Sequence, residues 1–561
     1  MPLTQSCQFA VRRHGAWPMV FLLSTLAGCG GGGTSSSSTA SAYTVGGTVS
    51  GLSGSLTLQD DGGDNLTLSS NGPFTFATPL PQGGLYSVTI ASQPGGSTCA
   101  VSDGTGGVSA KVSTVLVQCY ATPATGRWTW VSGFNVTDEA GAYGTAGTAT
   151  SGSLPGARQA PSAWTDANGN FWLFGGYGFD YNANLGLLND LWEYEPAVRQ
   201  WVWMSGSESV GSNGNYGTQG QAAAANAPPA RGGAASWTDS MGQLWLFGGI
   251  SSQASGSAVE FNDLWRFQPA TGQWTWMSGA DTSNGAGSYG TQGVAASGNV
   301  PPARAFPTTW VDSAGVFWLF GGDQYGSSGV SAYFSDLWKY DPTSNLWTWV
   351  SGSSSPNAAG SYGTQGTAAP TNMPGSRAAA MAWIDTAGNL WMMGGQGKDQ
   401  NGNTGGLNDL WRYGTTSGEW TWMAGAATQA ASGNYGSRGV AAAGNVPGAR
   451  SGASAWTDAS GNFWLFGGDG YDQSGNGGDL SDLWEYNPGA GQWTWMGGSS
   501  LSQATGNYGT QGVAAPGNLP GAREQAARWI DGQGNLWLFG GLGIDSLGQQ
   551  DDLSDLWSFA P

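Results

Sequence analysis

The chain has almost no histidine and very little lysine. Its one histidine is His14, near the N-terminus, and its lysines are Lys111, Lys339 and Lys398. Without histidine in the body of the chain, histidine-dependent triads and most zinc sites are excluded, and we expect no metal and no cofactor. A formal charge of −19 argues against nucleic acid or an anionic membrane surface as a partner, since both need a basic surface. We interpret the net negative charge as a feature that keeps a secreted, tryptophan-rich protein soluble.

Residues 1–28 read as a targeting segment. Arg12 and Arg13 are basic, and a short apolar run follows and ends in Leu-Ala-Gly-Cys at residues 26–29. This ending resembles the lipobox of bacterial lipoproteins. The resemblance implies a lipoprotein signal peptide, cleavage before Cys29 and acyl chains on Cys29 that hold the protein on the membrane. The alternative is a plain signal peptide followed by a chance cysteine.

The residues after Cys29 bear on location. In the lipoprotein family an aspartate at the next position commonly marks retention in the inner membrane, and here that position is Gly30. The resemblance therefore implies the bacterial outer membrane, with the protein facing the periplasm or the cell exterior. Residues 29–42, rich in Gly and Ser, are predicted to be a flexible tether.

Residues 43–122 form a separate segment without tryptophan. Runs such as GSLTLQ and YSVTIAS alternate apolar and polar residues between turn residues, which predicts a small antiparallel β-sandwich. With Cys7 lost in the leader and Cys29 acylated, Cys99 and Cys119 are expected to form one disulfide in an oxidising envelope. A spacer or accessory binding module is the expected role.

From residue 127 to residue 561 one unit repeats six times with a period of 73 residues. The DLW triplets and the glycine pairs, such as Gly175-Gly176, keep this step. A fixed period with four strand-like segments in each unit predicts a radial array of small sheets. One arginine marks each unit: Arg158, Arg231, Arg304, Arg377, Arg450 and Arg523.

The first unit shows the four expected strands at residues 158–166, 170–174, 188–194 and 201–204. A glycine pair closing the second strand, an aromatic residue late in the third and a tryptophan in the fourth resemble the Kelch repeat. The resemblance implies an all-β fold, a six-bladed Kelch-type, galactose-oxidase-like β-propeller over residues 127–561. These units are longer than the usual Kelch unit, with the extra stretch between the fourth strand and the next first strand.

Each unit contains five tryptophans, and none lies elsewhere after the leader. The FWLF-type strands are apolar on both faces, so we interpret the tryptophans as core rather than as a sugar-binding platform. The first WxW pair precedes any first strand, and the last unit stops before its own. The strand at 127–131 is therefore expected to close the last blade beside residues 553–559, leaving no open edge. We expect a monomer.

The two long connections of each unit, from second to third strand and from fourth to the next first strand, fall at one end of the sheets. This long-loop face is the expected binding surface. Features present six times are interpreted as scaffold, because a functional centre is usually built once. The six arginines have two interpretations: they bond loop carbonyls or the DLW aspartates, or they ring the channel mouth and hold a carboxylate.

Residues that differ between units are better candidates for specificity. Aromatic and polar side chains on the long loops suit a glycan, and they equally suit an envelope protein. Two loops, starting at Asp180 and Asp399, have an oxygen-rich spacing faintly like a calcium loop, with polar turn residues as the simpler interpretation. The candidate binding residues, besides the six arginines, are Phe179, Tyr181, Tyr325, Tyr333, Tyr471 and Asp472.

Catalysis has little support in the sequence. Kelch-type propellers include galactose oxidase, whose copper site needs two histidines and a cross-linked tyrosine, so that activity is excluded here. We expect a lipid-anchored envelope protein, not an enzyme, that recognises a glycan or surface protein on the long-loop face. The alternatives are a sugar-acid isomerase or epimerase using arginines at the channel mouth, and a purely structural surface protein.

Overall fold

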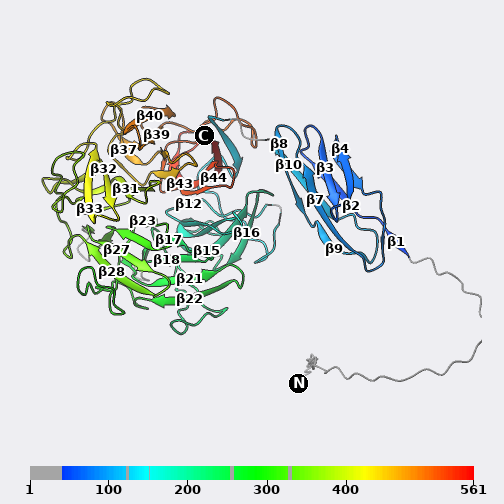
Figure 1. The fold of residues 1–561 in the computed structure, drawn as a ribbon, viewed down its shortest axis with the longest axis horizontal. Helices are drawn as coiled ribbons and strands as arrows, with labels where there is room; N and C mark the ends of the chain where they lie inside the picture. Colours follow the sequence, from blue (N-terminus) through cyan, green and yellow to red (C-terminus); the bar gives the residue numbers. More distant parts are fainter. Residues whose placement is uncertain (1–40, 122–124, 151, 253–257, 326–330) are drawn as a thin grey trace, which may run out of the picture.

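The computed structural model describes residues 41–121, 125–150, 152–252, 258–325 and 331–561. The leader, Cys29 and most of the tether lie outside these residues, so the expectations for them stay predictions. Every element in the described residues is a β-strand (Figure 1), which confirms the all-β prediction. Within the same residues, no helix is long and apolar enough to cross a membrane.

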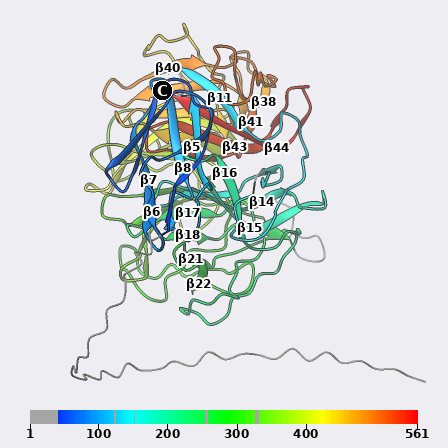
Figure 2. The same cartoon turned by 90° about the vertical axis from the view of Figure 1, so that its right-hand side faces the viewer.

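The N-terminal strands form two four-stranded sheets that lie beside the repeated sheets (Figures 1 and 2). Their apolar residues meet in one core that includes Val49, Leu58, Val88 and Val117. The first sheet contains β2 (Gly46–Ser50), β5 (Gly72–Thr75), β8 (Ser97–Ser102) and β10 (Val115–Ala121). The second contains β3 (Leu56–Asp60), β4 (Asp64–Leu68), β7 (Leu85–Ser92) and β9 (Thr105–Gly107), and β1 (Ala42–Tyr43) pairs with β6 (Leu80–Pro81).

One pair in these sheets, β2 with β10, is parallel. The sequence predicts antiparallel strands only, because alternation of apolar and polar residues is the same in both arrangements. Cys99 on β8 lies directly opposite Cys119 on β10, and the two form the predicted disulfide.

Each sequence unit folds into an antiparallel four-stranded sheet like a propeller blade. In the first unit the order is β13 (Ser162–Thr165), β14 (Phe171–Phe179), β15 (Leu185–Glu195) and β16 (Gln200–Ser205). The next two units contain β17 (Ala235–Thr238), β18 (Leu244–Phe247), β21 (Leu264–Gln268) and β22 (Gln273–Ser278), then β23 (Thr308–Val311), β24 (Phe317–Phe320), β27 (Leu337–Asp341) and β28 (Leu346–Ser351). The following two contain β30 (Met381–Ile384), β31 (Leu390–Lys398), β32 (Thr404–Gly414) and β33 (Glu419–Ala424), then β35 (Ser454–Thr457), β36 (Phe463–Phe466), β39 (Leu483–Asn487) and β40 (Gln492–Gly497).

The last unit draws a strand from the other end of the repeat region. Its sheet contains β42 (Ala527–Ile530), β43 (Leu536–Ile544) and β44 (Gln550–Ala560), and β11 (Arg127–Ser132) pairs antiparallel with β44. Trp128 lies opposite Phe559, and Trp130 lies opposite Trp557. The outer edge of β44 is therefore hydrogen-bonded to a strand that precedes it by more than 400 residues in the chain.

The predicted first strand of each unit is broken. In the first unit, β12 (Arg158–Gln159) is separated from β13 by Ala160, whose φ is 52°, and by Pro161, which has no N–H to donate. The loop expected between second and third strands is instead a hairpin that extends them past the glycine pair. Short strands of the same kinds are β19 (Ile250–Ser252), β20 (Ala258–Glu260), β25 (Asp323–Tyr325), β26 (Ser331–Tyr333), β29 (Arg377–Ala378), β34 (Arg450–Ser451), β37 (Asp469–Tyr471), β38 (Gly477–Asp479) and β41 (Arg523–Glu524).

The residue that breaks the first strand takes part in a closed cycle of backbone hydrogen bonds. Each such residue donates its N–H to the carbonyl of its equivalent in the preceding unit, at N–O distances of 2.7–3.0 Å, and Ala160 donates to Gln525. All have φ between 51° and 65°, so the N–H turns toward the neighbouring unit. We call them the cycle residues: Ala160, Gly233, Phe306, Ala379, Gly452 and Gln525.

The hydrophobic core of the repeat region lies between successive sheets. One cluster joins Trp164, Trp172 and Phe174 of the first unit to Trp265 and Phe267 of the second. The Trp164 indole donates to the carbonyl of Trp245 at 2.9 Å, so the buried ring also has its polar atom satisfied. The first and last units pack in the same way, with Phe171 stacked on Trp529 at 5.2 Å between ring centroids.

Candidate functional site

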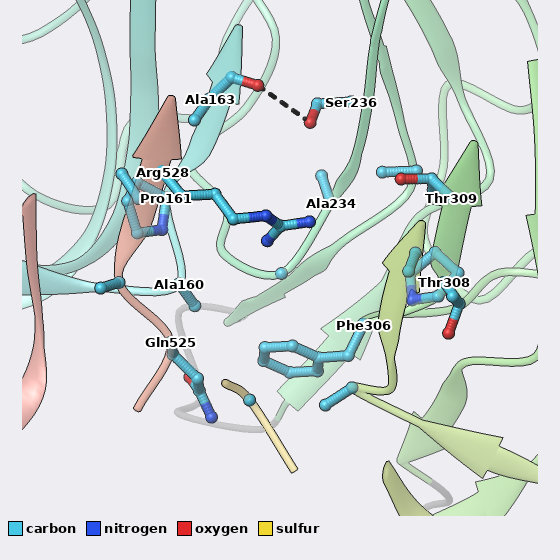
Figure 3. A pocket seen from close by; sticks show the side chains of 18 of the residues that line it. Ala160, Pro161, Ala163, Ala234, Ser236, Phe306, Thr308, Thr309, Gln525 and Arg528 are labelled. Atoms are coloured by element: carbon cyan, nitrogen blue, oxygen red, sulfur yellow. Dashed lines mark hydrogen bonds between the residues drawn. The ribbon is translucent and has the colours of Figure 1, made fainter. Parts of the chain in front are cut away.

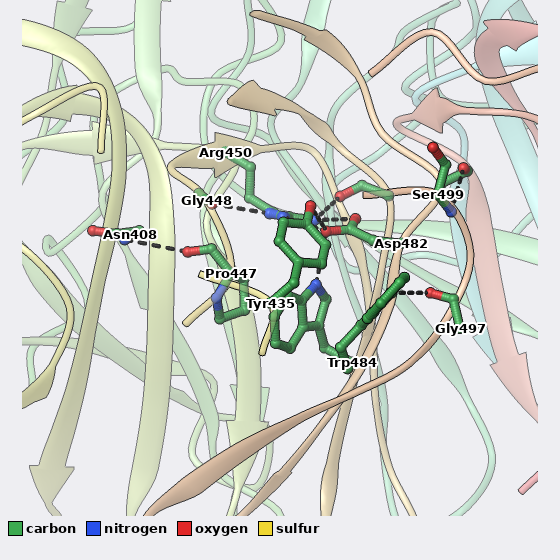
Figure 4. Close-up of polar contacts among 12 residues, drawn as sticks. Asn408, Tyr435, Pro447, Gly448, Arg450, Asp482, Trp484, Gly497 and Ser499 are labelled. Atoms are coloured by element: carbon green, nitrogen blue, oxygen red, sulfur yellow. Dashed lines mark hydrogen bonds and ion pairs between the residues drawn. The ribbon is translucent and has the colours of Figure 1, made fainter. Parts of the chain in front are cut away.

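The repeated arginine of each unit is the centre of a buried polar cluster, shown for the fifth unit in Figure 4. Arg450 Nη1 and Nη2 donate to Oδ1 and Oδ2 of Asp482 at 2.6 and 2.8 Å. Its Nε donates to the carbonyl of Gly448, and Nη1 also donates to that of Gly467. The hydroxyl of Tyr435 and the indole of Trp484 both donate to Asp482 Oδ2. Four N–H or O–H groups therefore saturate one carboxylate.

The same cluster occurs in every unit, with arginine to aspartate distances of 2.6–2.8 Å and both side chains at most 1% exposed. The structure thus places the arginines as in the first of the two interpretations, bonded to carbonyls and to the DLW aspartates. They do not line a surface that a ligand could reach. The pairs are Arg158–Asp190, Arg231–Asp263, Arg304–Asp336, Arg377–Asp409, Arg450–Asp482 and Arg523–Asp555.

The repeated tyrosines fasten the long loops to these clusters. Tyr435 lies in the loop before the fifth unit's sheet, with its ring against Trp484 and Trp495. Burial and then the Asp482 carboxylate raise the pKa of the Tyr435 phenol well above its usual value. The hydroxyl is thus a permanent donor and no candidate general base.

The candidate residues on the long loops lie on the extended hairpins. Tyr181 is 58% exposed in the turn between β14 and β15, and Tyr325, at the end of β25, is 45% exposed. Phe179, Tyr333 and Tyr471 are half-buried at the ends of β14, β26 and β37. Exposed aromatic side chains thus occur on some hairpins and not on others.

Asp472 differs from these tyrosines because it is 1% exposed. Its carboxylate accepts the backbone N–H groups of Ser474, Asn476 and Ser502 in a polar turn. Burial alone would raise the pKa of Asp472, but these hydrogen bonds outweigh it and lower the pKa. Asp180 and Asp399 sit in the same kind of turn, and among the described residues no three His, Cys, Asp or Glu side chains are grouped to hold a metal ion.

A cavity of about 340 Å³ lies between the first strands of the units (Figure 3). Every unit contributes to its wall, through the cycle residues and the residues up to three positions later. Most of these are Ala, Gly and Pro. We call it the inner-strand cavity, and its larger side chains are Phe306, Gln525 and Arg528.

Arg528 breaks the repeat. At the same position, five residues after the repeated arginine, the other units have Ala163, Ser236, Thr309, Ala382 and Ala455. Phe306 and Gln525 break it likewise, at a position that is Ala or Gly in the other units. Sequence reasoning missed all three, although a column-by-column comparison of the six units would have found them.

The Arg528 guanidinium extends into the inner-strand cavity (Figure 3). No hydrogen bond or ion pair joins it to another residue in the part of the chain that the structure describes. Protein surrounds the side chain, yet it keeps a large water-accessible surface because it borders the cavity rather than packed atoms. Burial lowers the pKa of Arg528, and no described carboxylate acts against that effect, but an arginine remains charged at neutral pH.

Acidic side chains also lie next to the cavity and along the hairpins, and sequence reasoning missed Glu524 among them. Glu524 precedes Gln525, whose amide donates to the Glu524 carboxyl at 3.4 Å. Burial, and then Asp479 and Asp469, raise the pKa of Glu524 to about 8. Burial raises the pKa of Asp479 to about 7 in the same way.

Three acidic side chains, Glu260, Asp479 and Asp552, occupy one position of the repeat and join neighbouring units. Glu260 accepts the backbone N–H of Tyr325 at 2.8 Å. Asp479 accepts the Gln550 amide at 2.7 Å, and Asp552 accepts the Gln159 amide at 3.1 Å. Acidic side chains at this position, which is not acidic in every unit, thus hold neighbouring units against one another.

No protein-family model matches the chain, and no curated protein matches it. Among solved structures, the chain is similar to the one described as "Structure of YjhT", at 15% identity and a TM-score of 0.43. The similarity covers 72% of this chain and 95% of that one. The repeated Arg–Asp and Tyr–Asp contacts are consistent with the Kelch blades that the sequence resembles.

Proposed function

We propose that this chain is a lipid-anchored envelope protein that binds a glycan on its long-loop face. The observation that carries the proposal is a division between two sets of residues. The arginines, aspartates and tyrosines that repeat in every unit are engaged in hydrogen bonds within the protein, whereas Tyr181 and Tyr325 stand at positions that differ between units and are exposed. Aromatic rings beside amide and carboxylate groups suit sugar rings, which offer C–H faces and hydroxyls.

The hairpins that carry these tyrosines suit a binding role. Tyr325 sits on a hairpin whose backbone is bound to Glu260 of the preceding unit. Tyr181 follows Asp180, which accepts two backbone N–H groups of its turn at 2.8 and 2.9 Å. A ligand would therefore meet two side chains whose own backbone N–H groups are held by hydrogen bonds, which reduces the entropic cost of binding.

The test is binding of residues 43–561 to a broad array of glycans and polysaccharides, followed by Tyr181→Ala and Tyr325→Ala. We expect a saturable signal that free sugar competes and that at least one variant weakens about tenfold or more, as for a lost stacking contact. Met241→Ala is the control, because Met241 is 71% exposed on the opposite end of its sheet. If no glycan on the array binds and one envelope protein is specifically cross-linked to the chain, the ligand of the long-loop face is a protein and not a glycan.

We also propose that the repeat region is a closed propeller of six Kelch-type blades. The pairing of β11 with β44 and the cycle of backbone hydrogen bonds through all six units support this. A chain starting at residue 125 should then stay monomeric and folded. A chain starting at residue 134 exposes the edge of β44 and should aggregate. Equal behaviour of the two chains would contradict closure.

The proposed attachment to the outer membrane is supported only by the sequence of the leader and Cys29. Cys29→Ala should abolish incorporation of labelled palmitate and release the protein into the soluble fraction, because the acyl chains supply the anchor. Unchanged membrane fractionation of the variant would contradict the lipoprotein assignment.

A further inference from the structure

The inner-strand cavity holds a cation that the fold does not require. Five units place alanine, serine or threonine where the last unit places Arg528, so a small side chain satisfies the scaffold at this position. A charge removed from bulk water without a counter-ion lowers the stability of the folded chain. The repeated arginines avoid this cost through their aspartates, whereas Arg528 has no partner in the described residues.

We propose that Arg528 and the inner-strand cavity bind the carboxylate of a small organic acid. The planar guanidinium fork suits a carboxylate, which can accept two parallel N–H···O bonds. The cavity, at about 340 Å³, lies at the lower end of the size range of small-molecule sites, roughly 300–1,000 Å³. This site is separate from the long-loop face and does not depend on the proposed glycan binding.

The remaining wall offers one aromatic face to the acid. Phe306 contributes an aromatic ring at a position where the other units have Ala, Gly or Gln. Gly233, which also lines the cavity, leaves room for that ring, since a Cβ on Gly233 would lie 2.7 Å from it. The wall around it is formed largely by Ala and Pro residues such as Pro161 and Pro307. The ring of Phe306 can contact an apolar part of the acid, while polar groups of the wall such as Gln525 can contact its polar groups.

The geometry of the site is set before a ligand arrives. Phe306 and Gln525 are cycle residues, so their backbones are bonded to the units on both sides at 2.7–2.8 Å. Arg528 lies on β42, which pairs with β43 in register from Ala527 to Ile530. The ring, the amide and the guanidinium thus emerge from ordered backbone, which limits the ordering cost on binding.

The experiment measures benzoate binding to the purified full chain by calorimetry, with benzamide as the uncharged counterpart. We expect saturable benzoate binding, and benzamide binding weaker on the order of tenfold or more, the loss typical of a hydrogen-bonded charge. Arg528→Ala should weaken benzoate by a similar factor and Arg528→Lys by less, because lysine keeps the charge but loses the fork. Phe306→Ala should weaken benzoate more than acetate.

The control is Arg438→Ala, which removes an exposed arginine outside the cavity and changes the net charge equally. It should leave benzoate binding unchanged. Arg528→Ala should melt no lower than the unsubstituted chain, since it removes a charge that no described residue pairs with and installs the residue found in three other units. Undetectable binding of both benzoate and acetate, equal binding by Arg528→Ala, or a clear loss of melting temperature in Arg528→Ala would each overturn the proposal.

Discussion

Arg450 and Asp482 face each other through two N–H···O bonds of 2.6 and 2.8 Å, and neither side chain is exposed to solvent. The aspartate also binds a tyrosine from the long loop and a tryptophan from its own strand. One ion pair thereby connects the start of a first strand, a third strand and a loop. Repetition of this pair in every unit explains why the DLW aspartate and the arginine keep the same 73-residue step.

Arg450→Ala should destabilise the protein strongly. It leaves the Asp482 carboxylate buried without its charge partner, a change that typically costs about 3–5 kcal/mol. Urea unfolding followed by tryptophan fluorescence measures the difference, with Arg438→Ala as the exposed control. A midpoint that does not move would contradict a structural role for the repeated arginines.

Tyr435→Phe should cost less, about 1.5–3 kcal/mol, because it removes one hydrogen bond to a charged acceptor and keeps the ring. The variant retains the contacts of the ring with Trp484 and Trp495. Thermal melting is the measurement, and Tyr181→Phe, at a tyrosine that is 58% exposed, should leave the melting temperature unchanged. Equal effects of the two variants would show that the hydroxyl of Tyr435 does not stabilise its loop.

Stability should fall as the pH rises from about 5 to 9. Burial and neighbouring acids raise the pKa of Glu524 to about 8, and burial raises that of Asp479 to about 7. The folded state then binds more protons than the unfolded state, so the stabilisation is complete below about pH 4 and is lost as the pH passes 7–8.

Glu524→Gln tests this dependence directly. It should raise the stability on the order of 2 kcal/mol at pH 9 and have little effect at pH 5, where the native side chain is already protonated. Melting curves across this range are compared with those of Asp281→Asn, which changes an exposed carboxylate in a loop. A pH profile unaltered by Glu524→Gln would assign the decline to other groups.

Loss of the disulfide should affect only the N-terminal sheets. Cys99 and Cys119 are 20 residues apart, and closing a loop of this length stabilises by about 3 kcal/mol. The double variant Cys99→Ser/Cys119→Ser should unfold its N-terminal sheets at lower temperature and leave the tryptophan-reported transition in place, since those sheets contain no tryptophan. A shift of the tryptophan signal by the same amount would show that the two regions unfold together.

The strands of the repeat region could be predicted in detail, because period and pattern act locally. FWLF-type segments and WxW pairs form strands wherever they occur, and the glycine pair allows the positive φ that bends the second strand, as at Gly175 and Gly176. The break in the first strand was not predicted. Ala160 and Phe306 take positive φ there without a local sequence signal, because the hydrogen bond to the neighbouring unit imposes it.

The candidate site was predicted less well. Tyr181 and Tyr325 are exposed on the hairpins, but the arginines are buried and Asp472 is part of a turn. Arg528 and Phe306 were not predicted, because a search for repeated residues and long loops does not detect a residue that differs in one unit only. Their importance depends on six strands meeting around one cavity, which no single unit reveals.

The sequence by itself determined the all-β class, the repeated four-stranded unit, the pairing of Cys99 with Cys119 and the core role of the tryptophans. These follow from short-range chemistry: alternation of residues, turn-forming glycines, and cysteine count. Only the tertiary structure decided that the repeated arginines are bound by aspartates 32 residues away and that Arg528 lies in a cavity with no counter-ion among the described residues. The reason is that the packing of distant segments sets the partners of a charged side chain. Arg523 and Arg528 are five residues apart, yet Arg523 is paired with a buried aspartate and Arg528 lines a cavity.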